Sequence, residues 1–301
     1  MQFGTVAHAG TTRAAALTDD GWRALAAPAA RAGDRDGHDA DGHDAEGYPA
    51  DLSAFLSAGG ALSSDAPLGE VLAGAEPLAP LPRPAKVICC GLNYGEHIRE
   101  TGRELPSHPT LFVKYADSLV GPTDDVCLLA GTDVDWEAEL AVVVGATIRH
   151  ADRVTAAAAI AGYTVANDVS VRDWQYRTLQ WFQGKAWDDS TPTGPVVVTP
   201  DEVDPTAGLT ITCRVNGEEV QRDSTKTLVF DSADLLAYIS TFTTLRPGDL
   251  VLTGTPGGVG TARDPQRFLA DGDVLETEVE GIGLLRNTIR LSPNPSLTTR
   301  A

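Results

Sequence analysis

The sequence predicts a β-rich α+β fold with a mixed, strongly coiled or barrel-like sheet rather than alternating strands and helices. Short runs of β-branched and apolar residues recur along the chain, whereas helical periodicity is confined to residues 153–161 and 232–241. Asn216-Gly217 joins two of the β-type runs and is a strong hairpin signal. The 301 residues are enough to bury a substantial core.

We expect a small N-terminal α/β domain over residues 1–80, with a strand at 3–7 and a short helix near 51–56. Between them, the Asp-, Gly- and His-rich stretch 31–51 predicts a flexible, solvated insertion. A separate zinc site at His38 and His43 is the weaker interpretation. The proline-rich segment before residue 85 indicates a linker into the main domain.

The main domain is expected over residues 83–292, followed by a tail at 293–301. It opens with an apolar run at 86–91 that predicts a buried strand, in which the adjacent Cys89 and Cys90 read as buried thiols rather than a disulfide. Ser232 is the expected N-cap of the helix over 232–241. Further strands are predicted at 110–114, 137–144, 194–199, 209–215, 249–253 and 273–279.

Charge and composition exclude several classes of function. The 23 Lys and Arg against 42 Asp and Glu give a formal net charge of −19, which argues against nucleic acid and anionic membranes as partners. No stretch approaches the ~20 apolar residues of a membrane span. The N-terminus shows no apparent secretory signal, and the four cysteines lack zinc-ligand spacing. We therefore expect a cytoplasmic protein.

Three carboxylates form the strongest candidate site. Glu137 and Glu139 are two residues apart on a predicted strand, so their side chains point the same way, and Asp168 follows a second apolar segment. An isolated pair of this kind is usually a solvated strand face. Here the strand continues as the apolar run 140–144, which places the acids near a core. Buried carboxylates favour a hard divalent cation: Mg²⁺, with Mn²⁺ or Ca²⁺ as alternatives.

Four further segments carry polar groups between the predicted strands. His97 and Glu100 share a helix face, where the carboxylate can orient the imidazole. Arg172 and Gln175 follow Asp168, and Lys185 lies among aromatic residues. The glycine-rich turn at 254–260 offers amides to a carboxylate, and it lacks the Lys-Ser/Thr ending of a nucleotide-binding loop.

In this order, the segments resemble the fumarylacetoacetate hydrolase family, in its acylpyruvase and 2-hydroxyhepta-2,4-diene-1,7-dioate isomerase-like branch. The resemblance covers roughly residues 83 to 292. It rests on the following motifs: Gly91-Leu92-Asn93-Tyr94 with His97 and Glu100, Phe112-Val113-Lys114, Glu137-Ala138-Glu139, Asn167-Asp168 with Arg172 and Gln175, Gly184-Lys185-Ala186-Trp187-Asp188, and Gly254-Thr255-Pro256-Gly257-Gly258-Val259-Gly260. It implies a mixed β-roll C-terminal domain and a homodimer.

The resemblance also implies roles for these residues. Glu137, Glu139 and Asp168 match the metal ligands, and His97, Glu100 and Lys185 match the catalytic residues. Those that match substrate-binding positions are Arg172, Gln175, Gly254 and Thr255. The substrate expected from this match is a small 2-oxo acid.

The expected reaction is hydrolysis of the carbon–carbon bond of an acylpyruvate-type 2,4-dioxo acid, through a metal-bound pyruvate enolate. Because other reactions pass through the same enolate, oxaloacetate decarboxylation and 2-oxo-dienoate isomerisation or hydration are the first alternatives. A non-catalytic metal-binding relative is the second.

Overall fold

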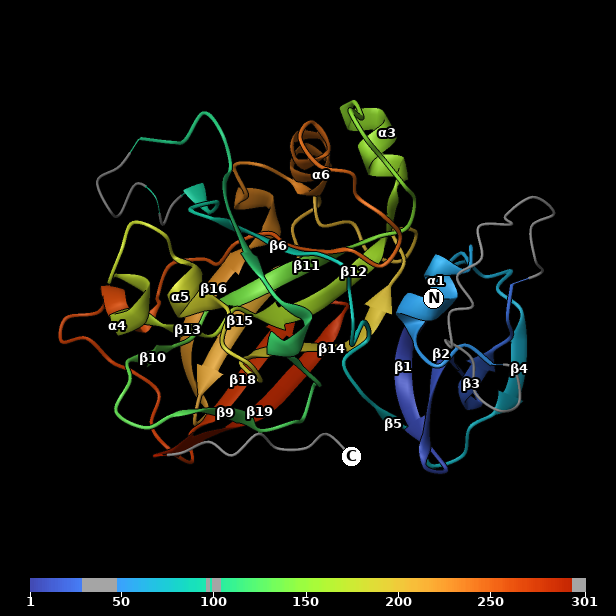
Figure 1. Ribbon diagram of the computed structural model, residues 1–301, viewed down its shortest axis with the longest axis horizontal. Helices are drawn as coiled ribbons and strands as arrows, with labels where there is room; N and C mark the ends of the chain where they lie inside the picture. The colour runs from blue at the N-terminus through green and yellow to red at the C-terminus, as the bar shows by residue number, and fades with distance from the viewer. Residues whose placement is uncertain (29–47, 96–97, 99–103, 294–301) are drawn as a thin grey trace.

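The computed structural model describes residues 1–28, 48–95, 98 and 104–293. The N-terminal strands lie at one side of the molecule beside a short helix, and a larger body of strands carries the remaining helices (Figure 1). The N-terminal elements are β1 (Gln2–His8), β2 (Thr11–Thr18), β3 (Gly21–Leu25), α1 (Leu52–Ser57), β4 (Leu68–Val71) and β5 (Glu76–Pro77). The strand expected at 3–7 and the short helix near 51–56 are therefore confirmed.

One large mixed sheet runs through both regions. Its path is β4-β3-β2-β1-β14-β12-β11-β17-β6-β7, with β5 paired to β1 and β8 paired to β14. The antiparallel pairing of β1 with β14 joins the N-terminal strands to the larger body. The strands not yet given are β6 (Val87–Gly91), β7 (Thr110–Lys114), β8 (Leu119–Val120), β11 (Ala138–Val144), β12 (Ile160–Asn167), β14 (Thr191–Val198) and β17 (Leu250–Leu252).

A second sheet of five strands has the order β16-β15-β18-β19-β9. Its predicted hairpin is confirmed: Asn216 and Gly217 have φ of 53° and 82° and connect β15 to β16, as a two-residue turn with both central residues at positive φ requires. The strands are β9 (Val126–Leu129), β15 (Thr210–Val215), β16 (Glu218–Ser224), β18 (Val274–Val279) and β19 (Gly283–Ser292). A short ladder joins β10 (Val134–Asp135) to β13 (Ser170–Val171).

Strand β11 lies at the centre of the core, and all seven of its residues are buried. Alternate side chains of a strand point to opposite faces. Leu140 and Val142 pack into the cluster that includes side chains of the five-stranded sheet, whereas Ala141 and Val143 pack into the cluster that includes Phe3. Burial on both faces explains why this strand reads as a continuous apolar run.

The helices that the structure describes in the larger body are short. They are α3 (Arg153–Ala158), α4 (Arg172–Gln175), α5 (Phe182–Lys185) and α6 (Ser232–Ser240), with the 3₁₀ turns η1 (Ala116–Ser118), η2 (Thr225–Thr227) and η3 (Gly260–Ala262). Helices α3 and α6 lie side by side at one end of the body (Figure 1).

Two details of these helices differ from expectation. Helix α3 ends at Ala158, because the chain enters strand β12 at Ile160 and pairs there with β11. The N-cap of α6 is Asp231 rather than Ser232: its carboxylate accepts a hydrogen bond from the amide of Asp234, in a capping box. Ser232 is the first residue of the helix.

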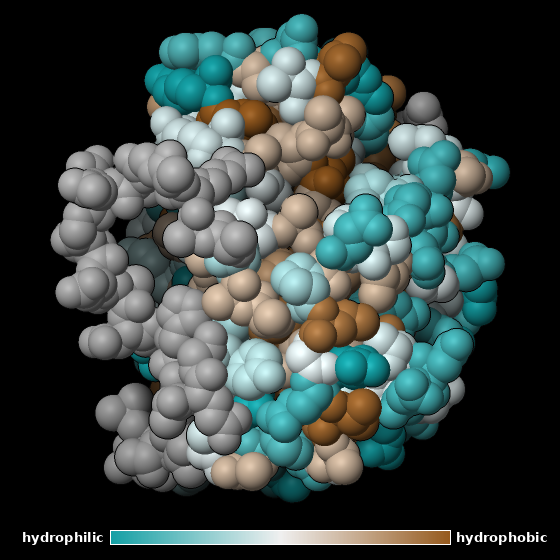
Figure 2. Space-filling view, turned by 90° about the vertical axis from the view of Figure 1, so that its right-hand side faces the viewer, coloured by the Kyte–Doolittle hydropathy of each residue, from teal (hydrophilic) through white to brown (hydrophobic). Residues whose placement is uncertain are grey.

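Several expected features lie outside the described residues. They are most of the insertion at 31–51, the residues His97 and Glu100 that are expected to be catalytic, and the tail beyond residue 293. Within the described ranges, no helix is long and apolar enough to cross a membrane. On the face nearest the N-terminal strands, hydrophobic side chains form small separate groups among hydrophilic ones (Figure 2).

Candidate active site

The register between β11 and β12 brings the three predicted acids together. Ala138 pairs with Asn167, so Glu137, just before β11, lies beside Asp168, just after β12. The amide of Asp168 donates to the carbonyl oxygen of Glu137 at 2.8 Å. Glu137, Glu139 and Asp168 are all buried, and each offers an oxygen within 4.8 Å of the oxygens from the other two. The structure therefore assembles the predicted trio.

Asp168 is held between two buried lysines. Its carboxylate oxygens lie 2.8 Å from Nζ of Lys114 and 2.8 Å from Nζ of Lys185. Burial opposes ionisation of Asp168, but Lys114 and then Lys185 lower its pKa below the ordinary value. Lys185 also lies 2.9 Å from Glu137. Although burial opposes its charge, Asp168 and Glu137 raise the pKa of Lys185, so the ammonium is charged near neutral pH.

Glu139 has a different environment. One carboxylate oxygen accepts a hydrogen bond of 2.6 Å from the amide of Gly254, and the other, Oε1, is buried without a hydrogen-bond partner. Among the described residues, no cation forms an ion pair with it. Burial, reinforced by the charges of Asp168 and Glu137, raises the pKa of Glu139 well above its ordinary value.

This arrangement fits a divalent cation. Four buried acids face three buried bases: Asp135, Glu137, Glu139 and Asp168 against Lys114, Arg172 and Lys185. One negative charge is left over when all are ionised, and the orphaned oxygen of Glu139 is where it is least compensated. Carboxylate oxygens are the ligands that hard divalent ions prefer. Glu137, Glu139 and Asp168 can therefore hold such an ion.

Arg172 fixes one wall of the site. Its Nε donates to Asp135 at 2.8 Å, one terminal nitrogen lies 2.7 Å from Glu137, and the other donates to Oε1 of Gln175 at 2.8 Å. All three guanidinium nitrogens therefore contact side chains of the protein. The side-chain oxygen of Gln175 accepts a hydrogen bond from Arg172. The amide nitrogen of Gln175 is therefore the group that can donate to a ligand.

The glycine-rich turn also contacts carboxylates of the protein itself. Besides the bond from Gly254 to Glu139, the amides of Gly260 and Thr261 donate to Asp135 at 2.7 and 3.0 Å. These bonds fasten the turn to the two strands that carry the acids. Thr255 reaches the cavity described next, and its Oγ1 accepts a hydrogen bond of 2.8 Å from Nε2 of Gln221.

A cavity of about 540 Å³ opens beside the acids. Its lining includes the charged and polar residues Glu137, Arg172, Gln175, Lys185 and Thr255. The other lining residues are Gly91, Leu92, Phe112, Tyr176, Thr178, Leu179, Trp181, Val259, Thr261 and Ala262. Nζ of Lys185 lies 5.0 Å from the centroid of the Phe112 ring. A Cβ atom at Gly91 would approach Trp181 to 2.5 Å, so glycine is required for this aromatic wall. A small organic anion can bind here with its charged end toward Lys185.

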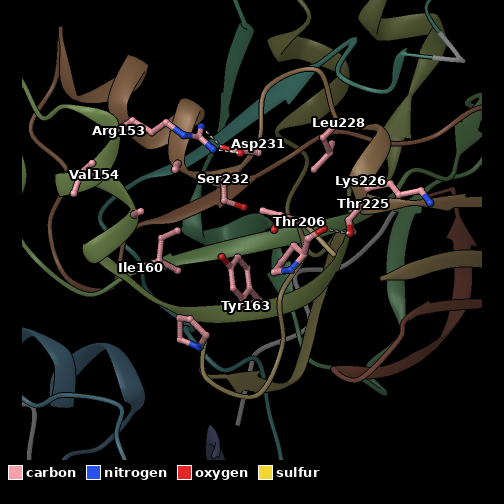
Figure 3. A pocket seen from close by; sticks show the side chains of 14 residues that line it. Arg153, Val154, Ile160, Tyr163, Thr206, Thr225, Lys226, Leu228, Asp231 and Ser232 are labelled. Atoms are coloured by element: carbon pink, nitrogen blue, oxygen red, sulfur yellow. Dashed lines mark hydrogen bonds and ion pairs between the residues drawn. The ribbon is translucent and has the colours of Figure 1, made fainter. Parts of the chain in front are cut away.

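A second cavity of about 540 Å³ lies near α3 and α6 and has a different lining (Figure 3). Ile160, Tyr163 and Leu228 line it, and Arg153 is paired with Asp231 at its edge. The only group of metal-binding side chains within the described residues is the one beside the first cavity. We therefore take the first cavity as the candidate active site.

Sequence reasoning missed four residues that build this site: Lys114, Asp135, Asn167 and Gln221. Lys114 and Asn167 belong to motifs of the family resemblance, but the sequence alone predicts no role for them. Asp135 lies between the apolar residues Val134 and Trp136, two residues before Glu137, and the two-residue spacing is the signal that could have grouped it with the acids. Gln221 gives no local signal, because its partners are distant in sequence.

Comparison with known proteins identifies the family. Residues 86–290 match the family described as fumarylacetoacetate (FAA) hydrolase C-terminal. The chain is 48% identical over 215 residues to the human oxaloacetate tautomerase FAHD2A, mitochondrial, which covers 70% of this chain and 68% of that protein. It is 44% identical over 215 residues to oxaloacetate tautomerase fahd2, mitochondrial, of Xenopus laevis, over 70% of this chain and 67% of that protein.

Solved structures agree. A fumarylacetoacetate hydrolase from Exiguobacterium antarcticum superposes with a TM-score of 0.80 at 31% identity, covering 97% of this chain and 100% of that one. A 5-carboxymethyl-2-hydroxymuconate delta-isomerase from Mycobacterium smegmatis superposes with a TM-score of 0.75 at 31% identity, over 98% of this chain and 100% of that one. The expected β-rich fold of this family is confirmed.

The expected cytoplasmic location is contradicted by these comparisons. The human and rat relatives at 47–48% identity are named as mitochondrial proteins. The cysteines could not have made this distinction: they form no disulfide, and this is compatible with more than one compartment.

The family match spans most of the chain, and within it Glu137, Lys185 and residues of the glycine-rich turn line one cavity, with Glu139 and Asp168 close to Glu137. The chain is an enzyme of the fumarylacetoacetate hydrolase family.

Proposed function

We propose that this enzyme interconverts the keto and enol forms of a 2-oxo acid, with oxaloacetate as its substrate. The observation that carries the proposal is the placement of Lys185, a buried ammonium between Glu137 and Asp168 at the wall of the cavity. The 48%-identical human relative, named an oxaloacetate tautomerase, supports this reaction over the hydrolysis expected from the sequence.

Tautomerisation moves one proton. The C3–H bond breaks, a C2–C3 double bond forms, and the 2-oxo oxygen gains a proton. Negative charge develops on that oxygen in the transition state, so a fixed cation beside it lowers the barrier. Lys185 has three N–H donors and gives one each to Asp168 and Glu137, which leaves a third for this oxygen. One such contact contributes roughly 3 kcal/mol.

We propose Mg²⁺ as the cofactor, with Mn²⁺ or Ca²⁺ as alternatives, held by Glu137, Glu139 and Asp168. When bound, the divalent ion supplies positive charge and polarises the 2-oxo group. The pKa of Glu139 is raised without the ion, so this carboxyl must release its proton as a ligand.

The rest of the cavity orients the substrate. Gln175 and Thr255 line the cavity, and the amide nitrogen of Gln175 and the hydroxyl of Thr255 can donate to the substrate carboxylate. Arg172 acts through Gln175, whose orientation it fixes with a hydrogen bond of 2.8 Å. The aromatic side chains of Phe112 and Trp181 shield the reacting carbon from water.

A proton acceptor is also needed at C3. We assign this role to the pair His97 and Glu100, which lies outside the described residues. The same pair would activate water in an acylpyruvate hydrolase, which is the second candidate function. Its specific support is the likeness to the fumarylacetoacetate hydrolase from Exiguobacterium antarcticum.

The test follows the loss of ultraviolet absorbance of enol-oxaloacetate with Mg²⁺, with acetylpyruvate cleavage measured in parallel. Glu139→Gln is the control, because it removes a proposed metal ligand without changing side-chain size. We expect rapid enol conversion that this substitution abolishes. If enol conversion stays at its spontaneous rate while acetylpyruvate is cleaved, the hydrolase function replaces the tautomerase.

A further inference from the structure

Gln221 of strand β16 connects the two halves of the site. Its side chain is buried, with an exposed fraction of 2%. Oε1 accepts a hydrogen bond of 3.0 Å from the amide of Ala138, the residue between Glu137 and Glu139. Nε2 donates to the carbonyl oxygen of Pro256 at 2.9 Å and to Oγ1 of Thr255 at 2.8 Å. One carboxamide therefore joins the segment bearing the acids to the glycine-rich turn.

The two backbone contacts determine which way this carboxamide points. A backbone amide can only donate and a backbone carbonyl can only accept. Oxygen must therefore face Ala138, and nitrogen must face Pro256. A flipped carboxamide would place two donors together and two acceptors together inside the core, which costs more than the bonds gained.

This orientation fixes the polarity of the Thr255 hydroxyl. Because Nε2 of Gln221 is the donor, Oγ1 of Thr255 is the acceptor in their contact. The single hydrogen of the hydroxyl must then point elsewhere, and the described residues supply no acceptor for it. Thr255 and Lys185 both line the cavity, so a ligand oxygen bound there can complete this bond.

We propose that Gln221 is a positioning residue that makes the Thr255 hydroxyl a hydrogen-bond donor to a carboxylate oxygen of the substrate. The inference rests on the proposed 2-oxo acid function and extends it to a residue that does not line the cavity. With the donor direction set before binding, the site favours an anionic oxygen over an N–H or O–H group of similar size.

Asn167 provides a natural comparison. Its Oδ1 accepts from the amide of Glu137 at 2.9 Å, so it supports the same segment one residue earlier. Its Nδ2, however, donates to Thr277 at 2.9 Å within the core. Asn167 thus shares the supporting role of Gln221, but its side-chain amide donates to Thr277 and not to Thr255.

The test is a double-mutant cycle on oxalate binding, a probe that resembles the enolate of pyruvate and needs no turnover. Gln221→Glu keeps an acceptor for Ala138 but turns the donor facing Thr255 into an acceptor. The hydroxyl then donates to the introduced carboxylate and presents a lone pair to the ligand. Dissociation constants are measured calorimetrically with saturating Mg²⁺ for the wild type, Gln221→Glu, Thr255→Val and the double variant.

We expect Gln221→Glu to weaken oxalate binding at least about tenfold more when Thr255 is present than in the Thr255→Val background. Repulsion between the introduced charge and oxalate occurs in both backgrounds and cancels in the cycle. Thr255→Ser keeps the hydroxyl and should therefore bind oxalate nearly as tightly as the wild type does. Asn167→Asp is the control: its effect on oxalate affinity should be the same in the wild-type and Thr255→Val backgrounds.

Equal effects of Gln221→Glu in both backgrounds would overturn the inference and leave the proposed function intact. Failure of the wild type to bind oxalate with Mg²⁺ would instead overturn the proposed function, and this inference with it. If Gln221→Glu does not fold, Gln221→Met enters the same cycle. Gln221→Met removes the donor to the hydroxyl without replacing it by an acceptor. We therefore expect it to weaken oxalate binding about threefold more when Thr255 is present than in the Thr255→Val background. Equal effects in the two backgrounds would contradict the proposal.

Discussion

The amide of Gly254 donates to one carboxylate oxygen of Glu139 at 2.6 Å, while the other oxygen of that carboxylate is buried without a hydrogen-bond partner. The first contact fixes the orientation of the side chain, and the carboxylate offers an oxygen within 4.8 Å of oxygens from Glu137 and Asp168. A buried, oriented but incompletely satisfied carboxylate is unfavourable in isolation and favourable beside a cation. Glu139 is therefore the residue on which metal binding should depend most.

Glu139→Gln should lower the affinity for Mg²⁺ at least about 100-fold. The same substitution should stabilise the metal-free protein by about 1–2 kcal/mol near pH 8, because it removes an unpaired buried charge. Calorimetric titration with Mg²⁺ and urea unfolding in a chelator measure the two effects. Tight Mg²⁺ binding by this variant would remove Glu139 from the ligand set.

The raised pKa of Glu139 predicts how stability depends on pH. In the metal-free protein, the folded state holds this proton more tightly than the unfolded chain does. The stabilisation is complete below the ordinary glutamate pKa and is lost as the pH rises through the raised folded value. We expect the free energy of unfolding of the wild type to fall relative to that of Glu139→Gln across this window. Parallel stability curves for the two proteins would contradict the assignment.

Lys185 and Lys114 both pair with Asp168, but only Lys185 lines the cavity. Lys185→Met should lower kcat for enol conversion by about 10²-fold, because it removes a donor to the developing charge. Lys114→Met should destabilise the fold by about 3 kcal/mol, since it leaves a buried carboxylate less compensated, but it should not share this loss of kcat. Steady-state kinetics and urea unfolding separate the two. Equal losses of kcat would place Lys114 in the catalytic step as well.

His97→Ala tests the proposed proton acceptor. It should leave the Mg²⁺ affinity unchanged and slow both enol conversion and any acylpyruvate hydrolysis by about 10²-fold. Decarboxylation of oxaloacetate needs no proton acceptor at C3 and should be affected less. Rates for the three reactions are compared at saturating Mg²⁺. Wild-type rates of enol conversion and hydrolysis in this variant would show that the assignment of His97 is wrong.

The central part of the fold and the three acids could be predicted because their signals are local. The run after Glu139 is apolar on both faces, and the Asn216-Gly217 turn has few alternatives to a hairpin. Strand β19 was missed: its alternation is interrupted by the buried Asn287, which donates to backbone oxygens of Gly121 and Asp124.

The remaining features depend on contacts distant in sequence. The alanine-rich run through Ala159 reads as a continuing helix, but pairing with β11 draws the chain into β12 at Ile160. Gln221 lies 83 positions from Ala138 and 34 from Thr255, so no pattern near it reveals its role. The substrate-binding positions inferred from the family resemblance remain predictions.

The most direct measurement is anomalous diffraction at the manganese edge from crystals of the protein soaked with Mn²⁺ and oxalate. Our account predicts a single strong peak among the carboxylates of Glu137, Glu139 and Asp168, with oxalate beside it and within reach of Lys185. A protein that binds oxalate but shows no manganese there, or shows it at another site, would contradict the account.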